Sequence, residues 1–293
     1  MTKACSVSTE SEVPGISREE LRDVVRRALA EDLGEGDLTT HLTIPEGQRA
    51  RGTFFSKQLL VLAGIPVAAE VFKTIEPNCE CVVLAAEGKD VPPGEPLARV
   101  EGKAATLLSG ERVALNFLQR LSGIATLTRE FKKQIVGLKT ELLDTRKTTP
   151  GLRALEKYAV RMGGGRNHRL RLDDGILIKN NHLVLAGGIR AAVERARAQR
   201  PPGILVEVEV RTLAELEEAI AAGAEFVLLD NMTPDVVARC VERAAGRAKL
   251  EVSGGVNLGN LRAYAETGVD RVSVGALTHS APAADINFLI ERL

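Results

Sequence analysis

The apolar positions of the first third of the chain predict a helix, a small sheet and a second helix. Ser17 and Glu20 have the spacing of a capping box, and apolar residues then recur at helical spacing as far as Gly34. From about residue 50 to 105 the apolar runs are short and are broken by Gly and Pro. We expect this stretch to form a small antiparallel sheet. Residues 110–136 return to helical spacing.

From residue 140 onward, apolar runs alternate with amphipathic helices. The runs predict six strands, within "ELLDT", "GILIKNN", "ILVEVEV", "FVLLDN", "LEVSGG" and "RVSVGA". Strand–helix alternation indicates a parallel sheet covered by helices, and a recurrence of roughly 22 residues is the compact spacing of a (β/α) barrel. Six strands are fewer than the eight of a full barrel. Either the segment "YAVRMGGGRNHRL" hides one or two strands or the barrel is incomplete, and a doubly wound open sheet is the alternative.

Polar residues follow each of the six predicted strands. They are Asp144 to Lys147, Lys179 to His182, Glu207 to Arg211, Asp230 with Asn231, Ser253 to Gly255, and Gly275 with Thr278 and His279. In a barrel the C-terminal ends of all strands lie on one rim, which is where such enzymes carry their chemistry. One solvated strand end would mean little, but six in succession predict an active site.

Composition and charge exclude several classes of protein. The 39 basic and 39 acidic residues cancel, and a general nucleic-acid binder normally has a basic excess. Aromatic residues are 3% and Trp is absent, which argues against a stacking platform for single strands. The apolar run at 59–69 is too short to span a bilayer, and the first residues lack a secretory signal. We expect a cytoplasmic protein with four reduced thiols: Cys5, Cys79, Cys81 and Cys240.

The charge of the rim indicates its ligand. Nine Lys and Arg residues lie between positions 144 and 182, against four acidic residues, which predicts a small polyanionic ligand. Glycines in "SGG" at 253–255 allow backbone N–H groups to approach a phosphate, although a tight turn would explain them equally well. Glu209 and Asp230 beside phosphates are a usual setting for Mg²⁺. Glu207 faces the same side of its strand, but position at the rim favours Glu209. For His182, capping and catalysis both stay open.

Several ordered blocks resemble the quinolinate phosphoribosyltransferase family. They include "GERVALNFLQRLSGIAT", "DTRKTTPGLRALEKYAV", "GGGRNHRLRLDDGILIKNNH" and "VSVGALTHS", and the match runs from the helix near residue 20 to the C-terminus. The resemblance implies an α/β fold with an open-faced N-terminal sandwich (1–114, with 281–293 returning to it) and an irregular barrel of about seven strands (115–280). It also implies Mg²⁺-dependent transfer of phosphoribose from phosphoribosyl pyrophosphate to quinolinate, which yields nicotinate mononucleotide, CO₂ and pyrophosphate.

The same resemblance assigns roles to individual residues. Quinolinate would be held by Arg146, His168, Arg169 and Lys179. The ribose, pyrophosphate and metal would meet Lys147, Glu209 and Asp230, and phosphates would meet the loops at Ser253, Gly254, Gly255 and Gly275, with His279 nearby. Arg112 would reach the site of a partner subunit, which implies a homodimer with shared active sites or a larger oligomer. Asn180 stands where the family often has an acid. Thr148 and Thr149 would start the helix that follows.

Two other functions are compatible with parts of the pattern. One is a paralogous transferase of the same fold, such as the protein associated with molybdate transport, and the complete quinolinate-facing set argues against it. The other is a non-catalytic sensor of a phosphorylated metabolite. Such a sensor would not need Glu209 and Asp230 beside Lys147.

Overall fold

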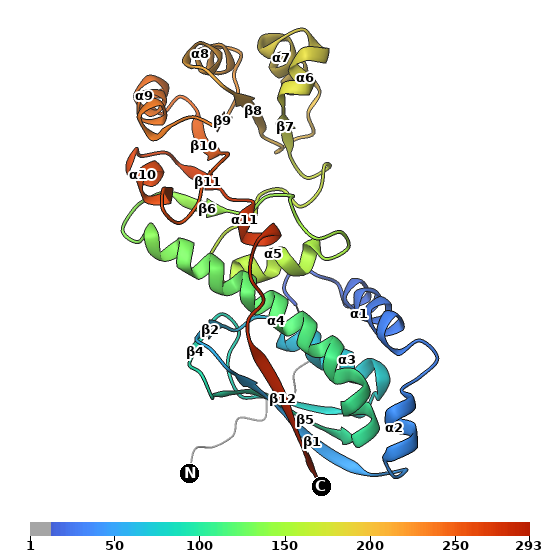
Figure 1. Ribbon diagram of the computed structural model, residues 1–293. Helices are drawn as coiled ribbons and strands as arrows, with labels where there is room; N and C mark the ends of the chain where they lie inside the picture. Colours follow the sequence, from blue (N-terminus) through green and yellow to red (C-terminus); the bar gives the residue numbers. More distant parts are fainter. Residues whose placement is uncertain (1–12) are drawn as a thin grey trace. The chain divides into compact units, whose positions relative to one another are not determined.

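The first helix begins where the capping box predicts. In the computed structural model, which describes residues 13–293, α1 spans Arg18–Leu33 (Figure 1). The Ser17 hydroxyl accepts a hydrogen bond from the Glu20 amide at 3.2 Å, and the Glu20 carboxylate accepts one from the Ser17 amide at 3.1 Å. Gly34 ends the helix with a φ of 52°, a conformation that glycine adopts readily. Cys5 lies outside the described residues.

The predicted small sheet is present and antiparallel. Its strand order is β12-β1-β5-β3, and the strands are β1 (Arg49–Ser56), β3 (Glu80–Val83), β5 (Pro96–Lys103) and β12 (Ile286–Arg292). Alternate residues of β1 are buried, which is the period of a strand with one covered face. The accompanying elements are α2 (Leu38–Thr43), α3 (Ile65–Ile75), α4 (Ala104–Gln134) and the two-stranded pair β2 (Leu60–Val61) and β4 (Asp90–Val91).

An aromatic cluster joins the last strand of this sheet to its core. The ring centroid of Phe288 on β12 lies 4.4 Å from that of Phe54 on β1 and 5.8 Å from that of Phe72 on α3. Both Phe54 and Phe72 are buried. Gly52 makes room for the cluster, because a Cβ there would lie 1.9 Å from the Phe288 ring. Strand β12 is therefore part of the core and not an appendage.

All six strands predicted after residue 140 are present in one parallel sheet. The order is β6-β11-β10-β9-β8-β7, and the strands are β6 (Glu141–Leu143), β7 (Ile176–Ile178), β8 (Val206–Val210), β9 (Phe226–Asp230), β10 (Lys249–Ser253) and β11 (Arg271–Ser273). Helices follow the strands: α6 (Asn180–Ala186), α7 (Ile189–Gln199), α8 (Leu213–Ala221), α9 (Pro234–Ala244), α10 (Leu261–Glu266) and α11 (Ala276–His279). Figure 1 shows α7 to α10 ranged along the outside of this sheet.

The segment suspected of hiding a further strand makes a single bridge. Arg166 pairs with Leu143 in the parallel sense, its amide donates to the Leu142 carbonyl at 2.8 Å, and its carbonyl accepts from the Asp144 amide at 3.1 Å. The parallel sheet of the described residues thus has six full strands. The strand order runs from β7 to β11 in sequence and then returns to β6, which is the order of an incomplete barrel and not that of a doubly wound sheet.

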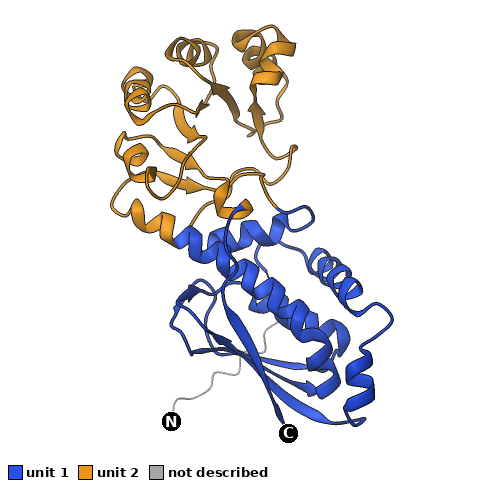
Figure 2. Cartoon of the chain, in the orientation of Figure 1, with its two compact units in different colours: residues 1–129, 149–164, 280–293 blue, residues 130–148, 165–279 orange. Residues whose placement is uncertain are grey.

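The chain divides into two compact units, coloured separately in Figure 2. Unit 1 comprises residues 1–129, 149–164 and 280–293, and unit 2 comprises residues 130–148 and 165–279. The division expected at residues 114/115 falls within α4, and it stays a prediction. None of the helices in the described part of the chain is long and apolar enough to cross a bilayer.

The expected start of the helix after "DTRKTT" was wrong. Helix α5 spans Arg153–Met162, with Leu152 at the N-cap position. The Thr149 hydroxyl donates a hydrogen bond to Oε1 of Glu156 at 2.7 Å, and its amide donates to Oε2 at 3.1 Å. Gly151, between Thr149 and the helix, has a φ of 80°, which is not a helical conformation, so the helix starts later than the local sequence suggests.

Candidate active site

The parallel topology places most of the predicted site residues at one edge of the unit 2 sheet. Each strand of a parallel sheet ends at the same edge, and Ser253 at the end of β10 is paired with Asp230 at the end of β9. The predicted residues that follow strand ends or lie in the adjoining loops of unit 2 are Arg146, Lys147, His168, Arg169, Lys179, Glu209, Asp230, Ser253, Gly254, Gly255, Gly275 and His279. Arg112 is different, because it is an exposed residue of α4 in unit 1.

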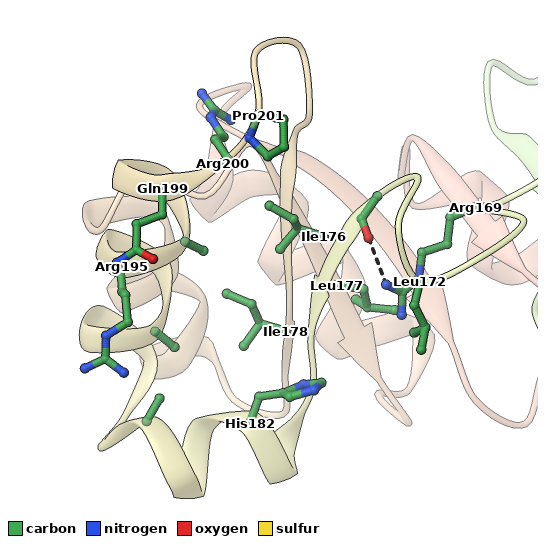
Figure 3. Close-up of a pocket in the computed structure, with 14 residues that line it drawn as sticks. Arg169, Leu172, Ile176, Leu177, Ile178, His182, Arg195, Gln199, Arg200 and Pro201 are labelled. Atoms are coloured by element: carbon green, nitrogen blue, oxygen red, sulfur yellow. Dashed lines mark hydrogen bonds between the residues drawn. The ribbon is translucent and has the colours of Figure 1, made fainter.

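Two guanidinium groups form the basic part of this edge. The Nε atoms of Arg146 and Arg169 are buried and have no hydrogen-bond partner among the described residues. Burial, and then the nearby charge of Arg146, lowers the pKa of Arg169. Nη1 of Arg169 donates to the Gly175 carbonyl at 2.8 Å, which holds the side chain in place (Figure 3). Two neighbouring cations with orphaned donors are arranged to receive an anion.

Lys147 lies against a glycine that leaves room for it. A Cβ on Gly275 would lie 2.9 Å from Cδ of Lys147 and 3.2 Å from Nε2 of His279. The Lys147 carbonyl accepts a hydrogen bond from the Thr278 hydroxyl at 2.7 Å. The loop after β11 therefore fixes both the backbone and the aliphatic stem of Lys147. Lys147 as a whole is an exposed residue.

The two acidic residues of the edge are each held by a neutral amide. Oε1 of Glu209 accepts from Nδ2 of Asn180 at 2.7 Å, and Oδ1 of Asp230 accepts from Nδ2 of Asn231 at 2.9 Å. Asn231 has a φ of 55°, and its amide donates to the Ser253 carbonyl at 2.9 Å. Asn180, whose role the sequence left open, thus orients one of the two acids.

The acidic pair fits a hard divalent cation. Carboxylate oxygens are the ligands that Mg²⁺ prefers, and Mg²⁺ keeps several waters and often binds substrate phosphates as well. A neutral amide donates to one oxygen of each carboxylate, and Oδ2 of Asp230 also pairs with Nε of Arg211 at 3.4 Å. The glycines beside Asp230 supply space, because a Cβ on Gly254 would lie 2.2 Å from Oδ1 of Asn231.

A buried polar cluster lies behind the basic part of the edge. Nε2 of His168 is 3.0 Å from Oε2 of Glu207 and 3.7 Å from Oε1 of Glu251. Burial, and then the charge of Glu207, raises the pKa of Glu251 to about 7. Glu251 is not among the site residues predicted from the sequence. The signal that could have found it is an acid facing the same side of β10 as Ser253, between the apolar Leu250 and Val252.

Asp144 ties the loop of His168 to the end of β6. It is fully buried, its Oδ1 accepts from the His168 amide at 2.8 Å, and its Oδ2 accepts from Nδ2 of Asn167 at 2.6 Å. Hydrogen bonds to this one carboxylate therefore hold the loop that carries Arg169 against the strand end that carries Arg146.

His182 caps a helix. Its Nδ1 accepts a hydrogen bond from the Lys179 amide at 2.9 Å, at the first turn of α6, so the structure favours capping over catalysis. His182 also lines a cavity of about 530 Å³ between β7 and α7, where Figure 3 shows Arg195 and Gln199 on the α7 side. Of the predicted site residues only Arg169 borders this cavity. The cavity therefore adjoins the strand-end site at Arg169.

Comparison with known proteins gives a consistent result. Residues 37–122 match the family model described as "Quinolinate phosphoribosyl transferase, N-terminal domain", and residues 124–289 match the corresponding C-terminal domain model. The chain is 44% identical over 267 residues to a probable nicotinate-nucleotide pyrophosphorylase [carboxylating] of Synechocystis, with 90% of each chain covered. It is 43% identical to a probable enzyme of the same name from Bacillus subtilis, with 92% of each covered.

Solved structures show the same similarity. The nicotinate-nucleotide pyrophosphorylase from Francisella tularensis superposes with a TM-score of 0.89 at 38% identity, over 96% of this chain and 99% of that one. The enzyme of the same name from Ehrlichia chaffeensis gives a TM-score of 0.88 at 38% identity, over 94% of this chain and all of that one.

Proposed function

Because the chain belongs to the quinolinate phosphoribosyltransferase family, we propose that its strand-end site joins quinolinate to phosphoribosyl pyrophosphate in NAD biosynthesis. The products are nicotinate mononucleotide, CO₂ and pyrophosphate. The observation that carries the proposal is the pair of Arg146 and Arg169. Their buried Nε donors have no partner in the part of the chain that the structure describes, and they lie at the edge that also holds Lys147, Glu209 and Asp230.

Quinolinate is a planar dicarboxylate, and the basic part of the site suits it. Each carboxylate can take a bidentate pair of hydrogen bonds from one guanidinium, which a single ammonium group cannot supply. Lys179 adds a third cation at the start of α6. Arg112 of the partner subunit completes the set in our proposal, because Arg112 is exposed on unit 1 and a homodimer would share its two sites.

Phosphoribosyl pyrophosphate occupies the rest of the edge. The backbone amides of Ser253, Gly254 and Gly255 bind phosphate, and Lys147 with its supporting Gly275 and neighbouring His279 binds the leaving pyrophosphate. Glu209 and Asp230 would hold Mg²⁺, directly or through water. When bound, the metal supplies charge neutralisation for the pyrophosphate.

The reaction requires charge stabilisation more than proton transfer. The bond from C1 of the ribose to the pyrophosphate oxygen breaks, and the electron pair leaves with pyrophosphate, which Lys147 stabilises. Positive charge develops on the ribose, which the nearby carboxylates favour. The pyridine nitrogen then attacks C1 and becomes cationic. The bond to the adjacent carboxylate breaks, CO₂ leaves, and the electron pair stays on the ring carbon beside N⁺ until a proton replaces it.

Location and assembly complete the proposal. We place the enzyme in the cytoplasm, because the described cysteines, Cys79, Cys81 and Cys240, form no disulfides and burial raises the pKa of each thiol. We assign a homodimer because Arg112 would act in the site of a partner subunit.

A side-by-side assay with quinolinate and nicotinate tests this function. The purified protein, with phosphoribosyl pyrophosphate and Mg²⁺, should release CO₂ and pyrophosphate in equal amounts from quinolinate. Nicotinate lacks one carboxylate, and losing a charged, desolvated contact typically costs about 2–5 kcal/mol, so nicotinate should turn over very slowly. Comparable rates with the two acids would contradict the assignment.

A further inference from the structure

The ring of His168 is turned into the protein, with both nitrogens engaged. Nδ1 accepts the amide N–H of Arg169 at 2.7 Å, and Nε2 lies 3.0 Å from Oε2 of Glu207. An N–H group can only donate, so Nδ1 carries no proton and the ring proton of the neutral imidazole is on Nε2. That N–H faces Glu207 and, at 3.7 Å, Glu251.

The two carboxylates that face the His168 ring are buried in the protein and are not surface groups. Glu251 is 0% exposed and Glu207 is 7% exposed. Oε1 of Glu207 and both carboxylate oxygens of Glu251 have no partner at hydrogen-bond geometry among the described residues, although the Ser273 hydroxyl lies close enough to Glu251 to lower its pKa. Burying carboxylate oxygens without hydrogen bonds costs free energy. Two such carboxylates beside one imidazole therefore need a functional explanation.

A metal centre is the rival explanation, and the protonation state opposes it. Ligand atoms of His168, Glu207 and Glu251 lie within 4.8 Å of one another. A metal bound at Nε2 would need the lone pair there and would move the ring proton to Nδ1. The Nδ1 proton would then point at the Arg169 amide proton, which occupies that position. The cluster is therefore arranged to hold an N–H group.

We propose that Glu207 and Glu251 are positioning residues that act through His168 on Arg169. They hold the imidazole so that Nδ1 fixes the Arg169 amide, while Asp144 fixes the His168 amide at 2.8 Å. The backbone from which the Arg169 guanidinium extends is thereby held at both sides. This inference rests on the proposed function, in which Arg169 binds a quinolinate carboxylate, and it changes the role expected for His168 from a direct ligand to a support.

Binding measurements with variants test the support. Glu251→Gln removes the ionisable carboxylate at nearly constant volume, and at pH 8, where a pKa of about 7 leaves Glu251 mostly charged, it should raise the dissociation constant for quinolinate about 10-fold or more, because small misplacements of a binding group are costly. The dissociation constant for phosphoribosyl pyrophosphate and the unfolding midpoint should stay unchanged. Glu225→Gln is the matched control, because Glu225 binds the amide of Val206 at the opposite end of β8.

His168→Asn, which keeps an acceptor near the Nδ1 position, should bind quinolinate better than His168→Gln does.

A spectroscopic readout separates this inference from the proposed function. Nitrogen-15 spectra of the ligand-free protein should show His168 as the neutral Nε2–H tautomer, with the signal assigned by its loss in His168→Gln. A cationic or Nδ1–H ring, or unchanged quinolinate affinity in Glu251→Gln, would overturn the inference. A divalent metal that copurifies at one per chain and is lost in Glu251→Gln would overturn it in favour of a metal centre. Failure of the wild-type protein to turn over quinolinate would reject the proposed function and leave the tautomer test intact.

Discussion

Gly275 and Lys147 share one small space, because a Cβ on Gly275 would lie 2.9 Å from Cδ of Lys147. Gly275→Ala should displace the lysine stem and leave the fold intact, since the displaced atoms belong to a flexible side chain. We expect stability to change by less than about 1 kcal/mol. The kcat/KM for phosphoribosyl pyrophosphate should fall by about 10-fold or more, because small misplacements of a reacting group are costly. Steady-state kinetics and urea unfolding measure the two effects. An unchanged kcat/KM would show that Lys147 tolerates the shift.

Glu209→Gln keeps the shape of the side chain and removes its charge. The new amide can still pair with Asn180, which hydrogen-bonds to Oε1 of Glu209 at 2.7 Å. We predict a fall in kcat of roughly 10²-fold, the scale for losing one preorganised electrostatic group. Glu194→Gln is the control, because Glu194 forms an exposed i,i+4 pair with Arg190 and no other ion pair among residues 13–293. Equal rates in Glu209→Gln and the wild type would remove Glu209 from the site.

Removal of divalent metal should separate the two substrates. Quinolinate is bound by guanidinium groups in our proposal, so its dissociation constant should be the same in chelator and in Mg²⁺. Phosphoribosyl pyrophosphate should bind much more weakly in chelator, because its charge near Glu209 and Asp230 is then uncompensated. Calorimetric titration of each substrate, with and without metal, gives the result. Metal-dependent quinolinate binding would place the ion among the quinolinate contacts.

Arg112 tests whether the two sites of a dimer are shared. Arg112→Ala and Lys147→Ala should each be nearly inactive as homodimers. In their heterodimer one site carries both lesions and the other carries neither. Random mixing makes about half of the dimers mixed, so about a quarter of wild-type sites should return. The two variants are unfolded and refolded together, and their activity is compared with that of each refolded alone. If mixed dimers are confirmed by mass and show no activity, Arg112 does not act across an interface.

Glu156 on α5 should be a determinant of the stability of unit 1. It is fully buried, accepts two hydrogen bonds from the Arg120 guanidinium at 3.2 and 2.8 Å, and accepts two from Thr149. Removing one partner of a buried pair typically costs about 3–5 kcal/mol, because the other charge is left without compensation. Glu156→Ala should therefore lower the free energy of unfolding by about that amount in urea. The double variant Glu156→Ala/Arg120→Met should recover part of the loss, and no recovery would mean that Thr149 dominates.

The sequence predicted those features that depend on local pattern and on strand direction. Capping at Ser17 and all six parallel strands followed from spacing alone, and the shared edge followed from the parallel topology. Features that depend on distant partners could not be predicted. Thr149 binds Glu156, seven residues further on, and does not start the helix. Glu251 became a candidate only because it lies near His168, which comes from another part of the chain. Roles of the site residues toward substrates stay predictions.

Strand β12 imposes an order on biosynthesis. It supplies an outer strand of the unit 1 sheet and places Phe288 against Phe54, yet it is translated after every residue of unit 2. On the ribosome, the parallel sheet can assemble from contiguous segments while the antiparallel sheet still lacks one strand and its aromatic anchor. Until residues 286–292 emerge, β1 keeps an unpaired edge, which is a template for pairing with other chains. The nascent polypeptide should therefore be most in need of a chaperone shortly before its synthesis reaches those residues.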